Sequence, residues 1–420
     1  MIKYLGSKRR LLPHILACVE SLPHVERVLD LLSGTSRAGH ALKARGYQVV
    51  ANDHNAYAWT LARCYVQADA DRVREEVDDR LQELRSAEPR RGWFTRTFCE
   101  EARYFHPDNG ARIEGARERI AAWTLDEDVE AVLLTSLMEA ADRVDSTTGV
   151  QMAYLKAWAP RALKPLELRM PAMLAGQGLA LNQDAADAAA TPVDLAYLDP
   201  PYNQHSYRSN YHVWETLVQW DDPTAYGIAR KREDCRTHKS AFNSKRAIGE
   251  ALTGVLARLR CPHVVLSFND EGHLAHEEVE AMLAAHGEVR VVEVEQPRYV
   301  GARIGIHNPR GERVGTVGRL RNREFLFVLE RGGPTAPRGS ARHHRHEVDG
   351  GTRPHPVEVD RPGVGVGERD PVGAVAEVRE DQAPGGIREP GRGARRHDVG
   401  HAAVLGLRPD AHPLQGNAQR

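Results

Sequence analysis

Short hydrophobic runs alternate with amphipathic segments over most of the chain before residue 331. Runs rich in branched apolar residues predict strands at residues 27–32, 47–53, 193–199, 263–268, 289–295 and 323–329. Segments with helical spacing of apolar residues follow the first two runs, and Gly46 is a stop signal for the first of them. This alternation predicts an α/β fold, in which helices cover both faces of a sheet.

One long segment, from about residue 69 to 165, does not alternate in this way. It is highly charged, its apolar residues have helical spacing, and it has no strand-like runs. We therefore expect a helical insertion at residues 67–164, between one half of the α/β unit at 1–66 and the other half at 165–331.

The composition changes after Arg331. The segment 332–420 contains no Phe, Tyr, Trp, Lys, Cys or Met and is rich in Gly, Pro, Arg and His. A segment of this kind cannot bury enough apolar surface to offset its conformational entropy, so we predict a low-complexity, disordered tail. The arginines and histidines are compatible with a nucleic-acid-binding tail, but an extension without function is the favoured interpretation.

The overall composition excludes several classes of protein. A formal net charge of -1 gives no global attraction to nucleic acid or membrane, although local basic patches remain possible. The five cysteines are scattered singly without a CxxC pair, which argues against a disulfide framework or a zinc site. Without a signal peptide or a long apolar segment, the chain is expected in the cytoplasm with no membrane partner.

A glycine loop follows the first predicted strand, in the sequence DLLSGTSRAG. Asp30 ends the strand, and Gly34 permits a tight turn close to a ligand. Asp53 ends the next strand, roughly 20 residues after the loop, where an acid holds the ribose of a bound nucleoside. The loop alone is equally typical of an ordinary βα turn. Together with Asp53 it favours a nucleoside cofactor, with Asp30, Gly34 and Asp53 as contacts.

The N-terminal sequence KYLGSK is unusual for a chain end. Tyr4 could lie against an adenine ring, and Lys8 could reach a carboxylate of the same cofactor. By itself, the segment would more often be a frayed basic terminus.

The sequence DPPY, from Asp199 to Tyr202, directly follows the strand predicted at 193–199. Two prolines end the strand at the carboxyl edge of the sheet, where α/β proteins bind ligands. The chemistry suits methylation of an exocyclic amine, whose lone pair is delocalised into the base. Asp199 and the backbone carbonyl of Pro200 can accept its two N–H hydrogens, and Tyr202 can stack on a base that has left the duplex. A sulfonium methyl donor is already activated, so no metal is expected.

These segments together resemble the Dam-like DNA adenine methylases, which use S-adenosylmethionine. The resemblance rests on DPPY, DLLSGTSRAG, KYLGSK and NQHSYRSNYHVWETL, and extends through SFNDEG and NREFLFVLE. It covers most of residues 1–331 and none of the tail. It implies a Rossmann-like methyltransferase sheet with a helical target-recognition insertion. Leu31 and Leu32 stand where the family usually has Pro and Phe.

The resemblance also implies roles for individual residues. Asp199 and Tyr202 would act on the target adenine, and we also place Asp199 among the cofactor contacts. The remaining cofactor contacts would be Tyr4 and Lys8 of the N-terminal motif, Asp53 at the ribose, and Asp184 at the adenine ring of the cofactor.

The expected partner is double-stranded DNA, with a separate restriction endonuclease as a possible second partner. Residues 88–105 mix arginines with the rings Trp93, Phe94, Phe98 and Tyr104, which could contact phosphates and bases or could fill the core of the insertion. Residues 143–158 and 234–247 are further candidate DNA-facing loops. Methylation of RNA or of a protein glutamine, and a catalytically silent nucleic-acid-binding scaffold, are the alternatives.

Overall fold

The computed structural model describes residues 1–152, 154–155, 157–297 and 321–331. The predicted tail at 332–420 lies outside the described residues. No helix within the described part of the chain has both the length and the apolar character that crossing a membrane requires.

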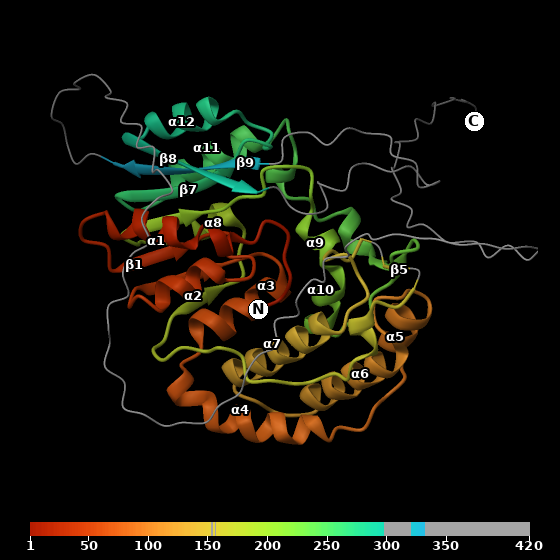
Figure 1. The fold of residues 1–420 in the computed structure, drawn as a ribbon. Helices are drawn as coiled ribbons and strands as arrows, with labels where there is room; N and C mark the ends of the chain where they lie inside the picture. Colours follow the sequence, from red (N-terminus) through yellow and green to blue (C-terminus); the bar gives the residue numbers. More distant parts are fainter. Residues whose placement is uncertain (153, 156, 298–320, 332–420) are drawn as a thin grey trace, which may run out of the picture. The chain divides into compact units, whose positions relative to one another are not determined.

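A mixed sheet forms the centre of the α/β part (Figure 1). Its strands, in the order in which they lie side by side, are β3 (Leu179–Leu181), β2 (Gln48–Asn52), β1 (Arg27–Asp30), β4 (Leu195–Leu198), β7 (His263–Asn269), β9 (Arg321–Glu330) and β8 (Glu288–Pro297). The first five are parallel, and β9 pairs antiparallel with both β7 and β8. This architecture is a Rossmann-like methyltransferase fold and confirms the predicted fold class.

Helices cover both faces of this sheet, because consecutive strand residues point to opposite sides. Val28 and Val49 pack with α1 (Leu12–Glu20) and α2 (Arg37–Lys43) on one face. The neighbouring Leu29 and Val50 pack on the other face, which is covered by α8 (Ala185–Ala188), α11 (Ile248–Arg258) and α12 (His276–Ala284). The continuously apolar runs in the sequence therefore reflect strands that are buried on both sides.

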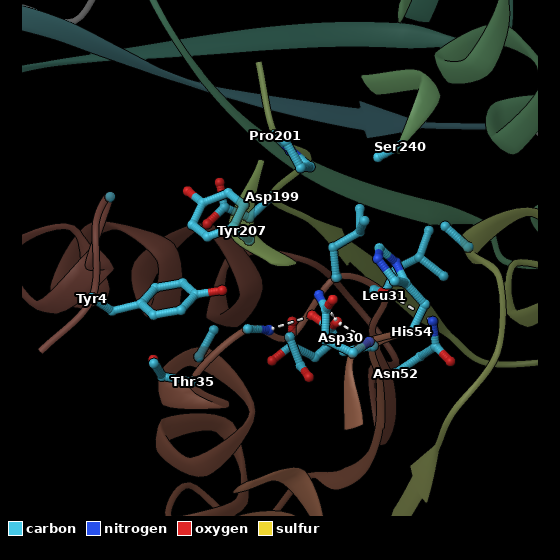
Figure 2. A pocket seen from close by; sticks show the side chains of 18 of the residues that line it. Tyr4, Asp30, Leu31, Thr35, Asn52, His54, Asp199, Pro201, Tyr207 and Ser240 are labelled. Carbon is cyan, nitrogen blue, oxygen red and sulfur yellow. Dashed lines mark hydrogen bonds between the residues drawn. The ribbon is translucent and has the colours of Figure 1, made fainter. Parts of the chain in front are cut away.

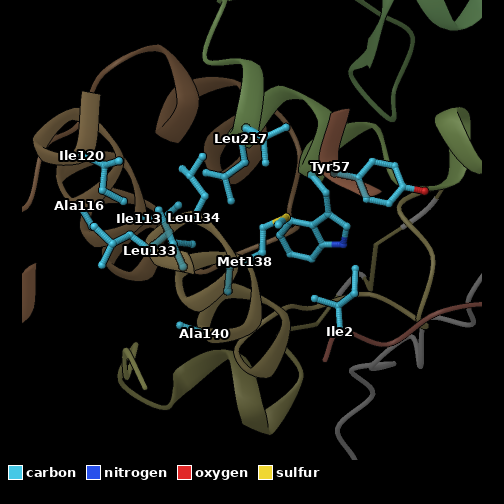
Figure 3. Packing of buried hydrophobic residues seen from close by; sticks show 14 of the residues in the cluster. Ile2, Tyr57, Ile113, Ala116, Ile120, Leu133, Leu134, Met138, Ala140 and Leu217 are labelled. Carbon is cyan, nitrogen blue, oxygen red and sulfur yellow. The ribbon is translucent and has the colours of Figure 1, made fainter. Parts of the chain in front are cut away.

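The insertion is helical, as predicted. It contains α4 (Ala70–Arg85), α5 (Trp93–Thr95), α6 (Pro107–Ala121) and α7 (Glu127–Arg143). These helices share one hydrophobic core with α3 (Ala56–Ala62) and α10 (His212–Gln219), which come after β2 and β4 in the sequence. Figure 3 shows Leu133 and Met138 of α7 in this core together with Tyr57 of α3 and Leu217 of α10. The insertion is thus packed directly onto the elements that follow β2 and β4.

Several short elements were not predicted from the sequence. β3 has only three residues and lies at the edge of the sheet, so it leaves no recognisable hydrophobic run. The two-stranded hairpin of β5 (Ala225–Tyr226) and β6 (Lys231–Arg232) is shorter still. The remaining elements are α9 (Tyr207–Asn210), π-helical turns at Arg63–Gln67 and Arg96–Glu100, and 3-10 turns at Lys8–Arg10, Pro160–Leu163, Glu233–Arg236 and Ala241–Asn243.

Candidate active site

A cleft lies at the carboxyl ends of β1, β2 and β4. The chain proceeds from β1 towards β2 and β3 in one direction and from β4 towards β7 in the other, so the cleft occupies the point where the strand order reverses. It encloses about 940 Å³ of empty space, part of which is open to solvent. Its lining includes residues predicted from the sequence as site residues, namely Tyr4, Lys8, Asp30, Gly34, Asp53 and Asp199. Figure 2 shows Tyr4, Asp30 and Asp199 in the cleft.

The glycine loop has a backbone conformation and a close contact that favour glycine. Gly34 has a φ of +53°, in the left-handed region, and a Cβ at this position would lie 3.2 Å from the ring of Tyr4. The amide of Gly34 donates a hydrogen bond of 3.0 Å to Oδ2 of Asp53. The loop, the N-terminal segment and the end of β2 are therefore held together at one wall of the cleft.

Tyr4 is part of a cluster of tyrosines. Its ring stacks against Tyr207 and Tyr211, with centroid distances of 5.0 and 4.6 Å, and its hydroxyl lies 3.0 Å from that of Tyr57. The N-terminal segment is thus anchored in the fold, and the interpretation as a frayed basic terminus is wrong. The predicted contact between Tyr4 and a cofactor ring stays a prediction.

Carboxylates gather along the floor of the cleft. Asp30 is buried and accepts a hydrogen bond of 2.8 Å from the amide of Gly39. Burial raises the pKa of Asp30 to about 7; the Gly39 amide opposes this shift, and the charges of Asp199 and Asp53 add to it. The second oxygen of Asp53, Oδ1, accepts hydrogen bonds from the backbone and side-chain amides of Asn55. Among the described residues, neither Asp30 nor Asp53 forms an ion pair, so these two carboxylates favour a ligand with positive charge.

Asp199 follows β4 directly and is held by residues from two other parts of the chain. Its Oδ1 lies 3.0 Å from Nζ of Lys8 and accepts a hydrogen bond of 3.0 Å from the hydroxyl of Ser267 on β7. The same lysine lies 3.5 Å from Oε2 of Glu324 on β9. Burial raises the pKa of Glu324, and the charge of Lys8 lowers it. Lys8 therefore contacts Asp199 in this structure, whereas the resemblance assigned it to the cofactor.

Of the other residues of DPPY, only Pro201 lines the cleft. Pro200 is buried. The ring of Tyr202 is outside the lining and packs against Phe268 at a centroid distance of 5.5 Å, with Nζ of Lys8 5.5 Å above it. Burial raises the pKa of Tyr202 to about 12, and the charge of Lys8 opposes the shift. Tyr202 thus remains a neutral ring beside Asp199.

Asp184 has a structural role in the fold. Its carboxylate accepts a hydrogen bond of 2.8 Å from the amide of Ala186 and caps the N-terminus of α8. Its neighbours Gln183 and Ala185 line the cleft, but Asp184 itself does not. The contact expected between Asp184 and a cofactor stays a prediction.

Three contributors to this site were not singled out from the sequence. Ser267 contacts Asp199 and Glu324 contacts Lys8, and both residues lie in segments that carry the resemblance. Asn243 donates hydrogen bonds of 2.8 and 3.0 Å to the carbonyls of Asn203 and His205, and so holds the loop after DPPY. A polar residue inside or just after a predicted strand could have marked Ser267 and Glu324 as candidate site residues. Such a position does not reveal which distant residue the side chain contacts.

The aromatic residues of the insertion are mostly core residues. Phe94, Phe98 and Tyr104 are no more than 1 % exposed, which settles the two alternatives for these rings in favour of packing. Arg90 pairs with Glu118, and Arg91 pairs with Asp108. The interpretation of these three rings as DNA contacts is therefore wrong.

Comparisons with known proteins agree with this geometry. A sequence profile of the D12 class of N6 adenine-specific DNA methyltransferases matches residues 4–276. The chain is 31% identical over 314 residues to Type II methyltransferase M.NlaIII of Neisseria lactamica, covering 72% of this chain and 90% of that protein.

Two further relatives are similar over comparable parts of this chain. Type II methyltransferase M.FokI of Planomicrobium okeanokoites is 30% identical over 312 residues, which are 68% of this chain and 47% of that protein. Type II methyltransferase M.CviAII of Paramecium bursaria Chlorella virus 1 is 28% identical over 305 residues, 69% of this chain and 90% of that protein. With its Rossmann-like sheet and a cleft at the strand reversal, the chain belongs to the D12 class of N6 adenine-specific DNA methyltransferases.

Proposed function

We propose that the chain transfers the methyl group of S-adenosylmethionine to the exocyclic amine of an adenine in double-stranded DNA, with Asp199 as the acceptor for that amine. The observation that carries this proposal is the meeting of Asp30, Asp53 and Asp199 in one cleft. Neither Asp30 nor Asp53 forms an ion pair with another residue that the structure describes, so these two carboxylates favour a cationic ligand, and S-adenosylmethionine carries a sulfonium and an ammonium group.

The residues of the cleft fit this cofactor in further respects. Within the described part of the chain, the buried hydroxyl of Ser33 has no hydrogen-bond partner, and Ser33 lines the cleft. Leu31 and Leu32 also line it and offer apolar surface to a purine. Asp53 would accept hydrogen bonds from the ribose, because a carboxylate has acceptor sites beyond those used by Gly34 and Asn55. Tyr4 and Gly34 would border the same ligand.

When bound, the cofactor supplies a methyl carbon that is activated by its positive sulfur, and the sulfur leaves as a neutral thioether. The side chain of Asp199 accepts a hydrogen bond from the target amine and stabilises the positive charge that builds on the nitrogen as the new N–C bond forms. The same carboxylate would take the proton that the nitrogen then loses. The Pro200 carbonyl would accept the second N–H, and Tyr202 would contact the face of the base.

The position of the cleft supports base flipping. An adenine inside a duplex cannot bring its amine to a carboxylate at the end of a strand, so the base must leave the stack. The helical insertion at 67–164 would contribute to target recognition, between a cofactor-binding half at 1–66 and a catalytic half at 165–331. The names of its relatives suggest that the chain acts in a restriction–modification system, with a separate endonuclease as the partner.

Methylation of genomic DNA tests the proposal directly. The purified full-length protein would be incubated with labelled S-adenosylmethionine and unmethylated genomic DNA, followed by nucleoside analysis and long-read mapping of modified positions. Label in N6-methyladenine within one short motif supports the proposal and identifies the target site. Bound cofactor without label in DNA would redirect it to RNA, and failure to bind the cofactor would overturn it.

A further inference from the structure

Lys8 lies between two carboxylates at the centre of the site. Its Nζ is 3.0 Å from Oδ1 of Asp199 and 3.5 Å from Oε2 of Glu324, and the lysine side chain is only 9% exposed. The side chains of Asp199 and Glu324 are 23% and 15% exposed. Electrostatic interactions between such weakly solvated groups are stronger than between surface charges, so each charge affects the other two.

The balance of charge in this group matters for methyl transfer. Lys8 and Asp199 alone would form a neutral pair, and a carboxylate that is neutralised in this way attracts a developing positive charge only weakly. With Glu324 the group has one positive and two negative charges. The net negative charge then faces the amine, which becomes positive as the N–C bond forms.

The contacts of Asp199 also leave one oxygen for the substrate. Lys8 and Ser267 both contact Oδ1, and no hydrogen bond to Oδ2 occurs among the described residues. The lysine can therefore orient Asp199 through Oδ1 while Oδ2 is presented to the amine. This arrangement is useful only if a second carboxylate offsets the charge of the lysine.

We propose that Glu324 is a positioning residue for methyl transfer, which offsets the charge of Lys8 so that the group of Lys8, Asp199 and Glu324 presents a net negative charge to the target amine. Glu324 acts through Lys8 and does not touch the substrate. This inference rests on the role proposed for Asp199.

The central variant is Glu324→Gln, which keeps the shape of the side chain and removes its charge. We expect kcat for methyl transfer to fall by about 10-fold to 100-fold, while KM for DNA and Kd for S-adenosylmethionine change by less than about twofold. Glu324→Asp should recover part of the loss in kcat. Glu330→Gln, on the same strand with an exposed side chain, is the matched control and should keep the activity of the wild-type protein. An unchanged kcat in Glu324→Gln would overturn the proposal.

A comparison in a Lys8→Met background distinguishes this role from simple structural support. In a Lys8→Met protein there is no positive charge to offset, so adding Glu324→Gln should cost little or no further activity. A merely structural role for Glu324 would give the same loss in both backgrounds. Equal losses would therefore overturn the proposal even if Glu324→Gln folds normally.

A readout on Lys8 itself is independent of methyl transfer. Burial lowers the pKa of Lys8, but Asp199, Glu324, Tyr202 and Tyr197 together hold it well above its usual value. Competitive labelling of lysine amines over a range of pH, read by mass spectrometry, should show a lower pKa for Lys8 in Glu324→Gln than in the wild-type protein. An unchanged pKa of Lys8 would overturn the charge coupling. If the wild-type protein binds cofactor but transfers no methyl group, the proposed function fails, whereas a changed Lys8 pKa with unchanged kcat overturns the positioning role alone.

Discussion

The amide of Gly34 donates a hydrogen bond of 3.0 Å to the carboxylate of Asp53, and this bond joins the loop after β1 to the end of β2. The two residues that the sequence pointed to as separate signals of a nucleoside site are therefore direct partners. The bond places the glycine loop where the ring of Tyr4 can lie against it. The geometry of this wall of the cleft depends on the absence of a side chain at residue 34.

Gly34→Ala should therefore lower both stability and cofactor affinity. Its φ of +53° costs a residue with a Cβ about 1–2 kcal/mol, and the new Cβ would lie 3.2 Å from the Tyr4 ring. Gly46→Ala is the matched control, because Gly46 has a φ of +89° but no atom within 4 Å of its would-be Cβ. Both variants should lose stability in chemical unfolding, but only Gly34→Ala should bind S-adenosylmethionine more weakly in calorimetry. Equal cofactor affinity in the two variants would contradict the assigned role of this wall.

Asp199→Ala should abolish methyl transfer. Loss of the acceptor for the target amine is expected to reduce kcat by about 1,000-fold or more, because the charge that builds on the nitrogen is no longer stabilised. Cofactor binding should be partly retained, since Asp30 and Asp53 remain. Single-turnover transfer of labelled methyl groups and calorimetric titration with the cofactor measure the two effects. Near-normal turnover in this variant would rule out the proposed mechanism.

Binding of S-adenosylmethionine should depend on pH through Asp30. With a pKa of about 7 in the free protein, this carboxyl group is mostly protonated at pH 6, whereas a cationic ligand favours its ionised form. Affinity should therefore rise with pH, with about fivefold weaker binding at pH 6 than at pH 7, and binding at pH 6 should release protons. Calorimetry in buffers of different ionisation enthalpy measures both effects.

Asp30→Asn is the control for this pH dependence, and its affinity for the cofactor should vary less with pH. The stability of the free protein should also depend on pH through Asp30. Because the folded state raises the pKa of Asp30, its contribution to stability is fully present below the unfolded pKa of about 4 and is lost as the pH rises through about 7. If binding and stability depend on pH identically in the wild-type protein and in Asp30→Asn, Asp30 is excluded as the source of the pH dependence.

Removal of residues 332–420 should leave methyl transfer within about twofold of the full chain, because the composition of this segment predicts no packed core. The cut must retain Arg331, whose guanidinium donates a hydrogen bond of 2.8 Å to the carbonyl of Leu259 after α11. Arg331→Ala in the full chain should lower the unfolding midpoint, whereas the truncation should not. Thermal unfolding and initial rates of methyl transfer compare the variants, and a large loss of activity on truncation would assign a function to the tail.

Local patterns in the sequence predicted the parts of the structure that depend on local physics. Buried strands such as β1 and β4 appear as apolar runs because each residue faces one of two covered sides, as Val28 and Leu29 do. The stop after Asp199 could be predicted because two prolines cannot continue a central strand. The acids at the ends of β1 and β2 could also be predicted to share one edge, because parallel strands end on the same side of a sheet.

Contacts between residues that are distant in sequence were decided only by the tertiary structure. Nothing near Lys8 indicates that it lies between Asp199 and Glu324, and nothing near Phe98 separates a ring that binds DNA from one that fills a core. Such contacts depend on how whole helices and strands pack against one another. The sequence by itself thus determined the fold class and the chemical groups at the edge of the sheet, whereas packing decided which of those groups meet, because side-chain partners are set by the three-dimensional arrangement of the elements that carry them.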